Sequence, residues 1–112
     1  MKYVPLIKSA KPKLEFMVGK YAVTLFDDIV SGGVIKYRYI MGVYDESKQP
    51  CYFVTSEVNA MVEEFGGSSH FLCIFDMEGH AIYNDSDDWA DEKKFTKEAL
   101  KIITEKFVIQ QA

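Results

Sequence analysis

Apolar and polar side chains alternate one by one through two segments in the first half of the chain. In residues 20–25 and again in residues 35–43, every second side chain is apolar. A period of two places successive side chains on opposite faces, which is typical of a strand with one buried face. Gly32 and Gly33 lie between the two segments and permit a tight reversal. The sequence therefore predicts a β-hairpin in this region.

Three further segments have the composition of strands. Residues 51–58 are rich in β-branched and aromatic side chains, and residues 70–75 are apolar at nearly every position. The second pattern is typical of a central strand that is covered on both faces. Residues 80–84 follow after a short reversal at Gly79, which predicts a second hairpin. Between these strands, residues 59–65 have the pattern of one short helix that Gly66 and Gly67 end.

The period of the apolar positions changes in the last third of the chain. From Phe95 to Phe107 apolar residues recur at helical spacing, with lysines and glutamates between them, which predicts an amphipathic helix of about five turns. We therefore expect an α+β fold: an antiparallel sheet of about five strands, a long C-terminal helix packed on one face, and one short helix between the third and fourth strands. No repeat or linker divides the sequence, so residues 1–112 are expected to form a single domain.

The acidic segment "YNDSDDWADEKKFTKEAL", residues 83–100, raises the question of a metal loop. A calcium loop requires a glycine at its sixth position and a bidentate glutamate at its twelfth. Counting from Asp85 places Ala90 and Thr96 at these positions, and counting from the residue before it fails in the same way. The segment therefore does not have the pattern of a calcium loop.

The same acidic residues suit the beginning of a helix. The first turn of a helix leaves N–H groups without partners and carries the positive end of the helix dipole. We expect Asp87 or Asp88 to cap these groups, with Asp91 and Glu92 in the favourable first turn. Trp89 would then fold back onto the sheet as an anchor.

The net charge of −4 is unevenly distributed. Seven basic and three acidic residues occur up to position 40, and six basic and fourteen acidic residues follow. Lys2, Lys8, Lys11 and Lys13 precede the first acidic residue, and we expect a solvated basic arm there. Because the sequence has no basic stripe and no recognition motif, we do not expect nucleic acid as a partner.

Hydropathy and cysteine content bear on the compartment. No segment approaches the roughly 20 apolar residues of a membrane span, and the first residues do not resemble a signal sequence. Cys51 and Cys73 lie within apolar segments, as small buried side chains do in a reducing environment. We therefore expect a cytoplasmic protein without a membrane partner.

Asp76 and His80 are the candidates for acid–base chemistry. A symmetrical reversal between them would place the carboxylate opposite the imidazole, the arrangement that orients a general base. In that register Cys73 lies three positions from Asp76, roughly 10 Å away, and points to the other face. No nucleophile accompanies the pair, so an enzyme is the less favoured interpretation.

No metal site or cofactor is expected. Neither histidine is spaced from a cysteine or from the other histidine as zinc ligands usually are, and His70 and His80 would stand at opposite ends of their hairpin.

An aromatic sheet face is the strongest indication of function. Tyr37, Tyr39 and Met41 share one face of their predicted strand, and Tyr44 lies on the other. One helix covers only part of a sheet of this size, so an aromatic patch is expected to remain open. The first hypothesis is a non-catalytic binding or protein-interaction domain, acting as a homodimer or on another protein through Tyr37, Tyr39, Met41, Tyr44 and Trp89. The alternative is a binder of apolar small molecules, or a small enzyme with an apolar pocket and the Asp76–His80 pair.

Overall fold

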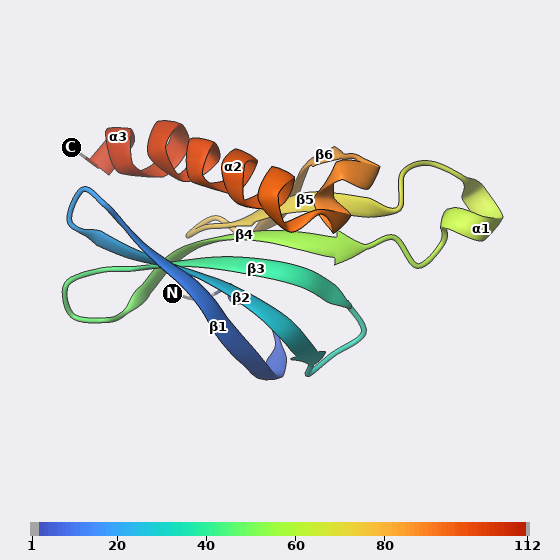
Figure 1. Ribbon diagram of the computed structural model, residues 1–112, viewed down its shortest axis with the longest axis horizontal. Coiled ribbons are helices and arrows are strands. Elements are labelled where there is room, and N and C mark those ends of the chain that lie inside the picture. Colours follow the sequence, from blue (N-terminus) through green and yellow to red (C-terminus); the bar gives the residue numbers. More distant parts are fainter. Residues whose placement is uncertain (1–2, 112) are drawn as a thin grey trace.

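The chain has the predicted α+β architecture, with one antiparallel sheet and a long C-terminal helix against one of its faces (Figure 1). The computed structural model describes residues 3–111, so Lys2 of the predicted basic arm lies outside the described residues. The sheet is a meander of six described strands in which each strand pairs with the next: β1 (Ile7–Val18), β2 (Tyr21–Ser31), β3 (Tyr37–Tyr44), β4 (Pro50–Val58), β5 (His70–Phe75) and β6 (His80–Asp85).

Strand β1 corrects the expectation of a solvated N-terminal arm and of about five strands. It pairs with β2 along most of its length and forms one edge of the sheet. Most of its side chains are exposed, so its sequence carries little apolar alternation. Three register shifts along the β1–β2 ladder interrupt what alternation there is.

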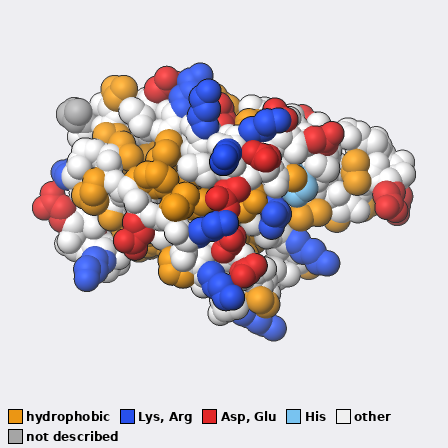
Figure 2. Space-filling view, viewed as in Figure 1, with side chains coloured by type: hydrophobic (Ala, Val, Ile, Leu, Met, Phe, Trp, Pro, Cys, Tyr) orange, Lys and Arg blue, Asp and Glu red, His pale blue; other side chains and the backbone are white. Residues whose placement is uncertain are grey.

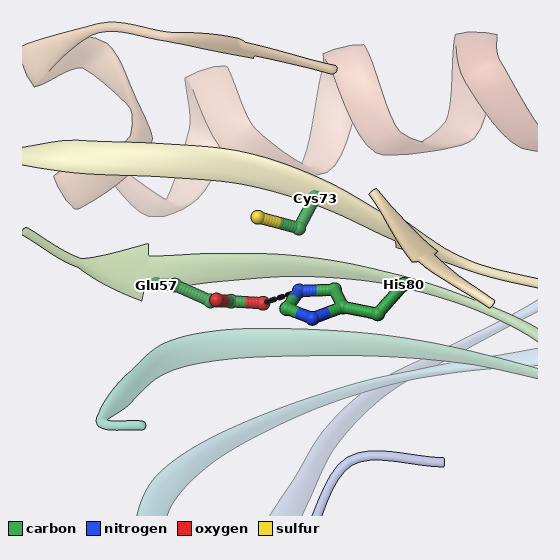
Figure 3. Close-up of side chains that lie close together, drawn as sticks. All are labelled: Glu57, Cys73 and His80. Atoms are coloured by element: carbon green, nitrogen blue, oxygen red, sulfur yellow. Dashed lines mark hydrogen bonds and ion pairs between the residues drawn. The ribbon is translucent and has the colours of Figure 1, made fainter. Parts of the chain in front are cut away.

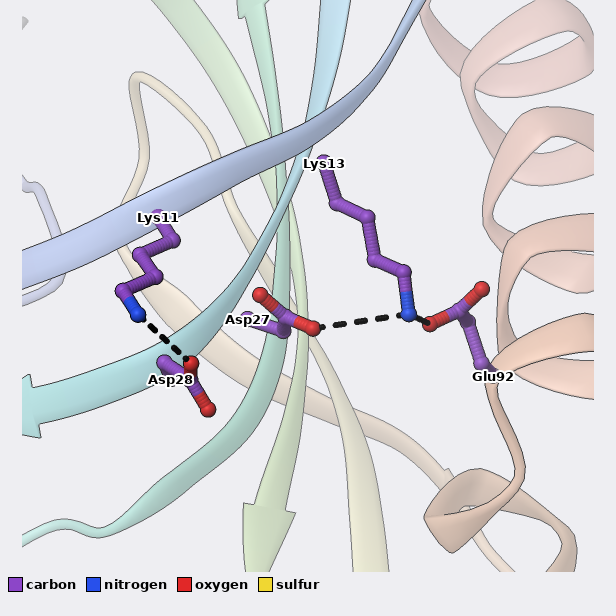
Figure 4. Close-up of polar contacts among 5 residues, drawn as sticks. All are labelled: Lys11, Lys13, Asp27, Asp28 and Glu92. Carbon is purple, nitrogen blue, oxygen red and sulfur yellow. Dashed lines mark hydrogen bonds and ion pairs between the residues drawn. The ribbon is translucent and has the colours of Figure 1, made fainter.

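Lys13 connects this edge strand to the C-terminal helix (Figure 4). Its Nζ pairs with the Glu92 carboxylate and lies 3.6 Å from Oδ2 of Asp27 in β2. The hydrogen bond to Glu92 is the main reason that the pKa of Lys13 is raised. A second pair joins Lys11 to Asp28 at 3.4 Å. Exposed pairs of this kind contribute little stability each, so they mainly orient the edge strand.

Charges of both signs are interspersed on the face seen in Figure 2, where hydrophobic side chains gather beside them. This view shows no large surface region of one charge sign. The ion pairs of Lys13 and Lys11 show how part of the basic N-terminal sequence meets acidic residues within the fold.

Two helical regions join the sheet. The short helix lies beyond one end of the strands, and the long C-terminal helix crosses the sheet as three consecutive segments (Figure 1). No helix among residues 3–111 is long and apolar enough to cross a bilayer. The helical segments are α1 (Val62–Phe65), the 3₁₀ turn η1 (Asp87–Ala90), α2 (Glu92–Ile102), the π-helical segment η2 (Ile103–Val108) and α3 (Ile109–Gln111).

The acidic segment begins a helix, as predicted, although the capping residues differ. Oγ of Ser86 accepts a hydrogen bond from the Asp88 backbone N–H at 3.1 Å and caps η1. The Asp91 carboxylate accepts from the Lys94 N–H at 3.0 Å and caps α2. Asp87, expected as a cap, instead accepts from the Ser69 N–H at 2.8 Å and holds the connection before β5.

The main core lies between α2 and the sheet. The Tyr39 ring stacks on Phe95 with 5.4 Å between ring centroids, and Phe95 is wholly buried. Trp89 donates from its indole N–H to Oδ1 of Asn84 at 2.9 Å, so the predicted anchor reaches the sheet. The side chains of this core include Val23, Leu25, Met41, Val43, Val54, Leu72, Ala99, Ile102 and Ile103.

A β-bulge divides the predicted tyrosine stripe. Tyr37 pairs with Glu57 and Tyr39 with Ser56, so Arg38 is an extra residue on β3. Tyr37 and Tyr39 consequently point to opposite faces, which corrects the expectation that they share one.

Phe95→Ala tests the packing of the helix on the sheet. Removal of a wholly buried ring is expected to lower the free energy of unfolding by about 3–5 kcal/mol. Phe65→Ala is the matched control, because Phe65 is 78% exposed in α1 and its removal should change stability by less than about 0.5 kcal/mol. Urea unfolding followed by circular dichroism measures both values. Equal losses in the two variants would contradict this packing.

Candidate functional site

The sheet face opposite α2 carries a second cluster of aromatic and aliphatic side chains. Tyr37, Ile40, Phe53 and Phe75 are buried there, and Phe26, Ile29 and Ile35 pack against them. At one end, Pro5 and Ile7 of the N-terminal segment help to close a hollow of about 120 Å³ beside Tyr44 and Phe53. This face therefore has an apolar lining that α2 does not cover.

A groove opens over the same face toward β6. Its volume is about 540 Å³, and a neighbouring hollow of about 190 Å³ shares Val34 and Ile35 with it. The wall of the groove is mostly apolar, with three charged or titratable side chains. Its lining residues are Val34, Ile35, Lys36, Glu57, Val58, Ala60, Phe71, His80 and Ile82.

Glu57 places a carboxylate in this apolar wall. The alternation of β4 directs Phe53, Thr55 and Glu57 to the uncovered face, and Glu57 is only 6% exposed. Its Oε2 accepts a hydrogen bond from the Thr55 hydroxyl at 2.8 Å and lies 2.8 Å from Nε2 of His80. A buried carboxylate is costly unless it is hydrogen-bonded and paired, and these contacts meet that requirement.

His80 approaches Glu57 from the first position of β6 (Figure 3). Its imidazole stacks on the Phe75 ring, with 4.2 Å between centroids and 11° between the planes. A carboxylate oxygen accepts hydrogen bonds, so Nε2 carries the proton in this contact. The His80 side chain is 31% exposed, which leaves part of the ring open to the groove.

Cys73 completes the group from the neighbouring strand. It pairs with Thr55 on one side and Ile82 on the other, and its side chain is wholly buried. Figure 3 shows the Cys73 side chain beside those of Glu57 and His80, and the ligand atoms of the three residues lie within 4.8 Å of one another. Burial, followed by the charge of Glu57, raises the pKa of the thiol far above its usual range. Cys73 is therefore a neutral thiol and not a thiolate nucleophile.

The predicted Asp76–His80 pair does not form. His80 faces Phe75 in the β5–β6 ladder, one position away from the symmetrical register. Asp76 instead accepts hydrogen bonds from the backbone N–H groups of Glu78 and Gly79, at 2.8 and 3.1 Å. Asp76 thus stabilises the turn, and the carboxylate partner of His80 is Glu57.

The predicted binding residues separate onto the two faces. Tyr39, Met41 and Trp89 are buried in the core beneath α2. Tyr37 and Tyr44 lie on the uncovered face, where Tyr44 makes an edge contact with Phe53 at 6.4 Å. Sequence reasoning missed Glu57, although a lone acidic residue in an otherwise neutral strand was the available signal.

Comparisons with protein-family models, with curated proteins and with solved structures find no match for this chain. The functional argument therefore rests on the groove and on the group formed by Glu57, Cys73 and His80.

The two cysteines are expected to differ in reactivity. Burial raises the pKa of both thiols, but Cys51 is partly exposed and Cys73 is wholly buried, so a thiol reagent at pH 8 should modify Cys51 first. In Cys51→Ser the remaining thiol should react only when urea unfolds the chain. Mass spectrometry of the labelled protein measures both rates. Rapid labelling of folded Cys51→Ser would contradict the burial of Cys73.

Tyr37 should make stability depend on alkaline pH. Burial, with a contribution from the charge of Glu57, raises the pKa of Tyr37 from 10.0 to about 12. Between these values the unfolded chain loses the proton and the folded protein keeps it, so the free energy of unfolding should fall as pH rises. Tyr37→Phe should reduce this fall in urea titrations from pH 9 to 12. An unchanged pH dependence would contradict the raised pKa.

Proposed function

We propose that this protein is a binding domain that holds a small, largely apolar molecule in the groove on the uncovered sheet face. The observation that carries the proposal is the pair of buried Glu57 and partly exposed His80 in a mostly apolar wall. Pockets for small molecules typically combine an apolar lining with a few converging polar groups, and their volumes are about 300–1,000 Å³. The groove of about 540 Å³ has both properties.

The hydrogen-bonding groups of Glu57 and His80 also indicate which chemical group of the ligand would bind beside them. Glu57 is an acceptor, and the neutral form of the His80 imidazole, with Nε2 donating to Glu57, offers Nδ1 as a second acceptor. A hydroxyl or amine group on the ligand would satisfy these acceptors. The ligand class is therefore an apolar molecule with a hydrogen-bond donor at one end.

Binding is better supported than catalysis by this arrangement. A carboxylate–imidazole pair can orient a general base, but the neighbouring Cys73 is buried behind it as a neutral thiol. Lys36 is the only other charged side chain in the described lining of the groove. We therefore propose no reaction at this site.

A second candidate function is self-association through the same face. Exposed hydrophobic side chains surround the groove and its neighbouring hollow: Leu6 is 65% exposed, Ile82 62% and Val34 98%. A second copy seated over them would remove this apolar area from water. This candidate retains the homodimer hypothesis but moves its contacts from Tyr39 to the rim of the groove.

Ile82→Glu tests the binding proposal with the neutral fluorophore N-phenyl-1-naphthylamine as the probe. Wild-type protein should bind one probe per chain, and a carboxylate in the groove wall should weaken binding by at least about tenfold, because apolar contact then requires desolvation of a charge. Met77→Glu is the matched control: Met77 is 70% exposed and lies in the β5–β6 turn, outside the groove lining.

Equal weakening in the two variants, or no saturable binding by the wild type, would contradict the proposed groove function. Native mass spectrometry of the same proteins separates the second candidate. A dimer that Ile82→Glu converts to monomer, with the probe not bound, would favour self-association over small-molecule binding.

A further inference from the structure

We propose that Glu57, Cys73 and His80 form a binding site for a divalent transition-metal ion of the zinc class, with a fourth coordination position that opens to the groove. The three residues supply a carboxylate oxygen, a thiol sulfur and an imidazole nitrogen, which lie within 4.8 Å of one another. They come from three adjacent strands, β4, β5 and β6, so the sheet itself holds them together (Figure 3). Within residues 3–111 no other group of three such ligands was found.

The distances are close to those of a tetrahedral centre. Zinc bonds of about 2.0–2.3 Å place the ligand atoms of such a centre roughly 3.3–3.7 Å apart. Nε2 of His80 and Oε2 of Glu57 are 2.8 Å apart and must separate slightly. The thiol sulfur, within 4.8 Å of both, must move by on the order of 1 Å, which a side-chain rotation supplies.

The donor types select the class of ion. Zinc and similar ions accept sulfur, nitrogen and oxygen together, whereas calcium and magnesium require oxygen donors. A thiolate and a carboxylate together neutralise a divalent cation, so the buried centre would carry no net charge. That balance suits a site in which Cys73 is wholly buried and Glu57 is 6% exposed.

Metal binding requires two proton movements. The Cys73 thiol releases its proton to solvent and becomes the thiolate that binds the ion. The proton on Nε2 of His80 exchanges through water to Nδ1, which frees the Nε2 lone pair for the metal. The Thr55 hydroxyl continues to donate to the Glu57 carboxylate and orients it.

The location explains the open fourth position. Glu57 and His80 line the groove, while Cys73 lies behind them. An ion held by all three would face the groove with its remaining position, where water or a donor atom of a bound molecule can complete the tetrahedron. The metal site does not depend on the proposed function of the groove.

Cobalt(II) titration of the metal-stripped, full-length protein tests this proposal, because thiolate coordination gives a charge-transfer absorption band that a carboxylate or imidazole alone does not. We expect one Co²⁺ per chain, a charge-transfer band, and displacement of Co²⁺ by Zn²⁺. Cys73→Ser should abolish the band. His80→Ala and Glu57→Gln should each weaken Co²⁺ binding by at least about tenfold, since even residues that only orient a ligand contribute this much.

The chain contains a matched control for two of the ligands. Its only other cysteine and histidine are Cys51 and His70, and both lie outside the proposed site. Cys51→Ser and His70→Ala should therefore keep the wild-type band and affinity. Loss of the band in Cys51→Ser, or unchanged affinity in His80→Ala, would overturn the proposal, as would the absence of a thiolate band in the wild type.

Folding of the variants does not confound the result. Circular dichroism checks that each variant is folded. If Cys73→Ser fails to fold, the metal affinities of His80→Ala and His70→Ala test the proposal instead, because both histidine side chains are partly exposed and their removal should leave the fold intact. N-phenyl-1-naphthylamine binding by metal-stripped protein reports the groove separately. Loss of metal binding with retained probe binding would overturn the metal site and leave the groove function standing.

Discussion

The carboxylate of Glu57, buried in an apolar sheet face, is the constraint that organises the uncovered side of this protein. A buried charge that is left without a partner costs about 3–5 kcal/mol, so the fold must bring hydrogen-bonding groups to this carboxylate. Thr55 comes from the same strand, two residues earlier, and His80 comes from the next hairpin. The register that places His80 opposite Phe75 is therefore tied to the position of Glu57.

The two faces of the sheet differ in what covers them. The C-terminal helix packs on one of them and buries aromatic rings, including the stacked pair Tyr39 and Phe95. The other face has its own apolar cluster but no helix across it in the described chain, and the groove lies there beside the polar group. The binding function that we propose would thus lie on the side of the sheet opposite the C-terminal helix.

The strands and the long helix could be predicted from the sequence because periods of two and 3.6 report directly on burial. Strand β1 escaped prediction since an edge strand with exposed side chains has no such period. The prediction that Tyr37 and Tyr39 share one face was wrong because of a bulge at Arg38. No local sequence pattern marks this bulge, which turns Tyr37 away from Tyr39. The predicted partner of His80 was wrong for a related reason. Glu57 is 23 residues away in the sequence, and only the register of the folded strands brings the two side chains together.

The most direct test of the account is the long-range ¹H–¹⁵N NMR spectrum of the two imidazole rings in wild-type protein and in Glu57→Gln, with metal removed. The contact at 2.8 Å predicts that His80 is protonated at Nε2 and that its ring ¹⁵N shifts change in the variant, while those of His70 do not. If the His80 shifts were those of a free surface histidine and did not respond to Glu57→Gln, the central pair, and with it the polar anchor of the groove, would be contradicted.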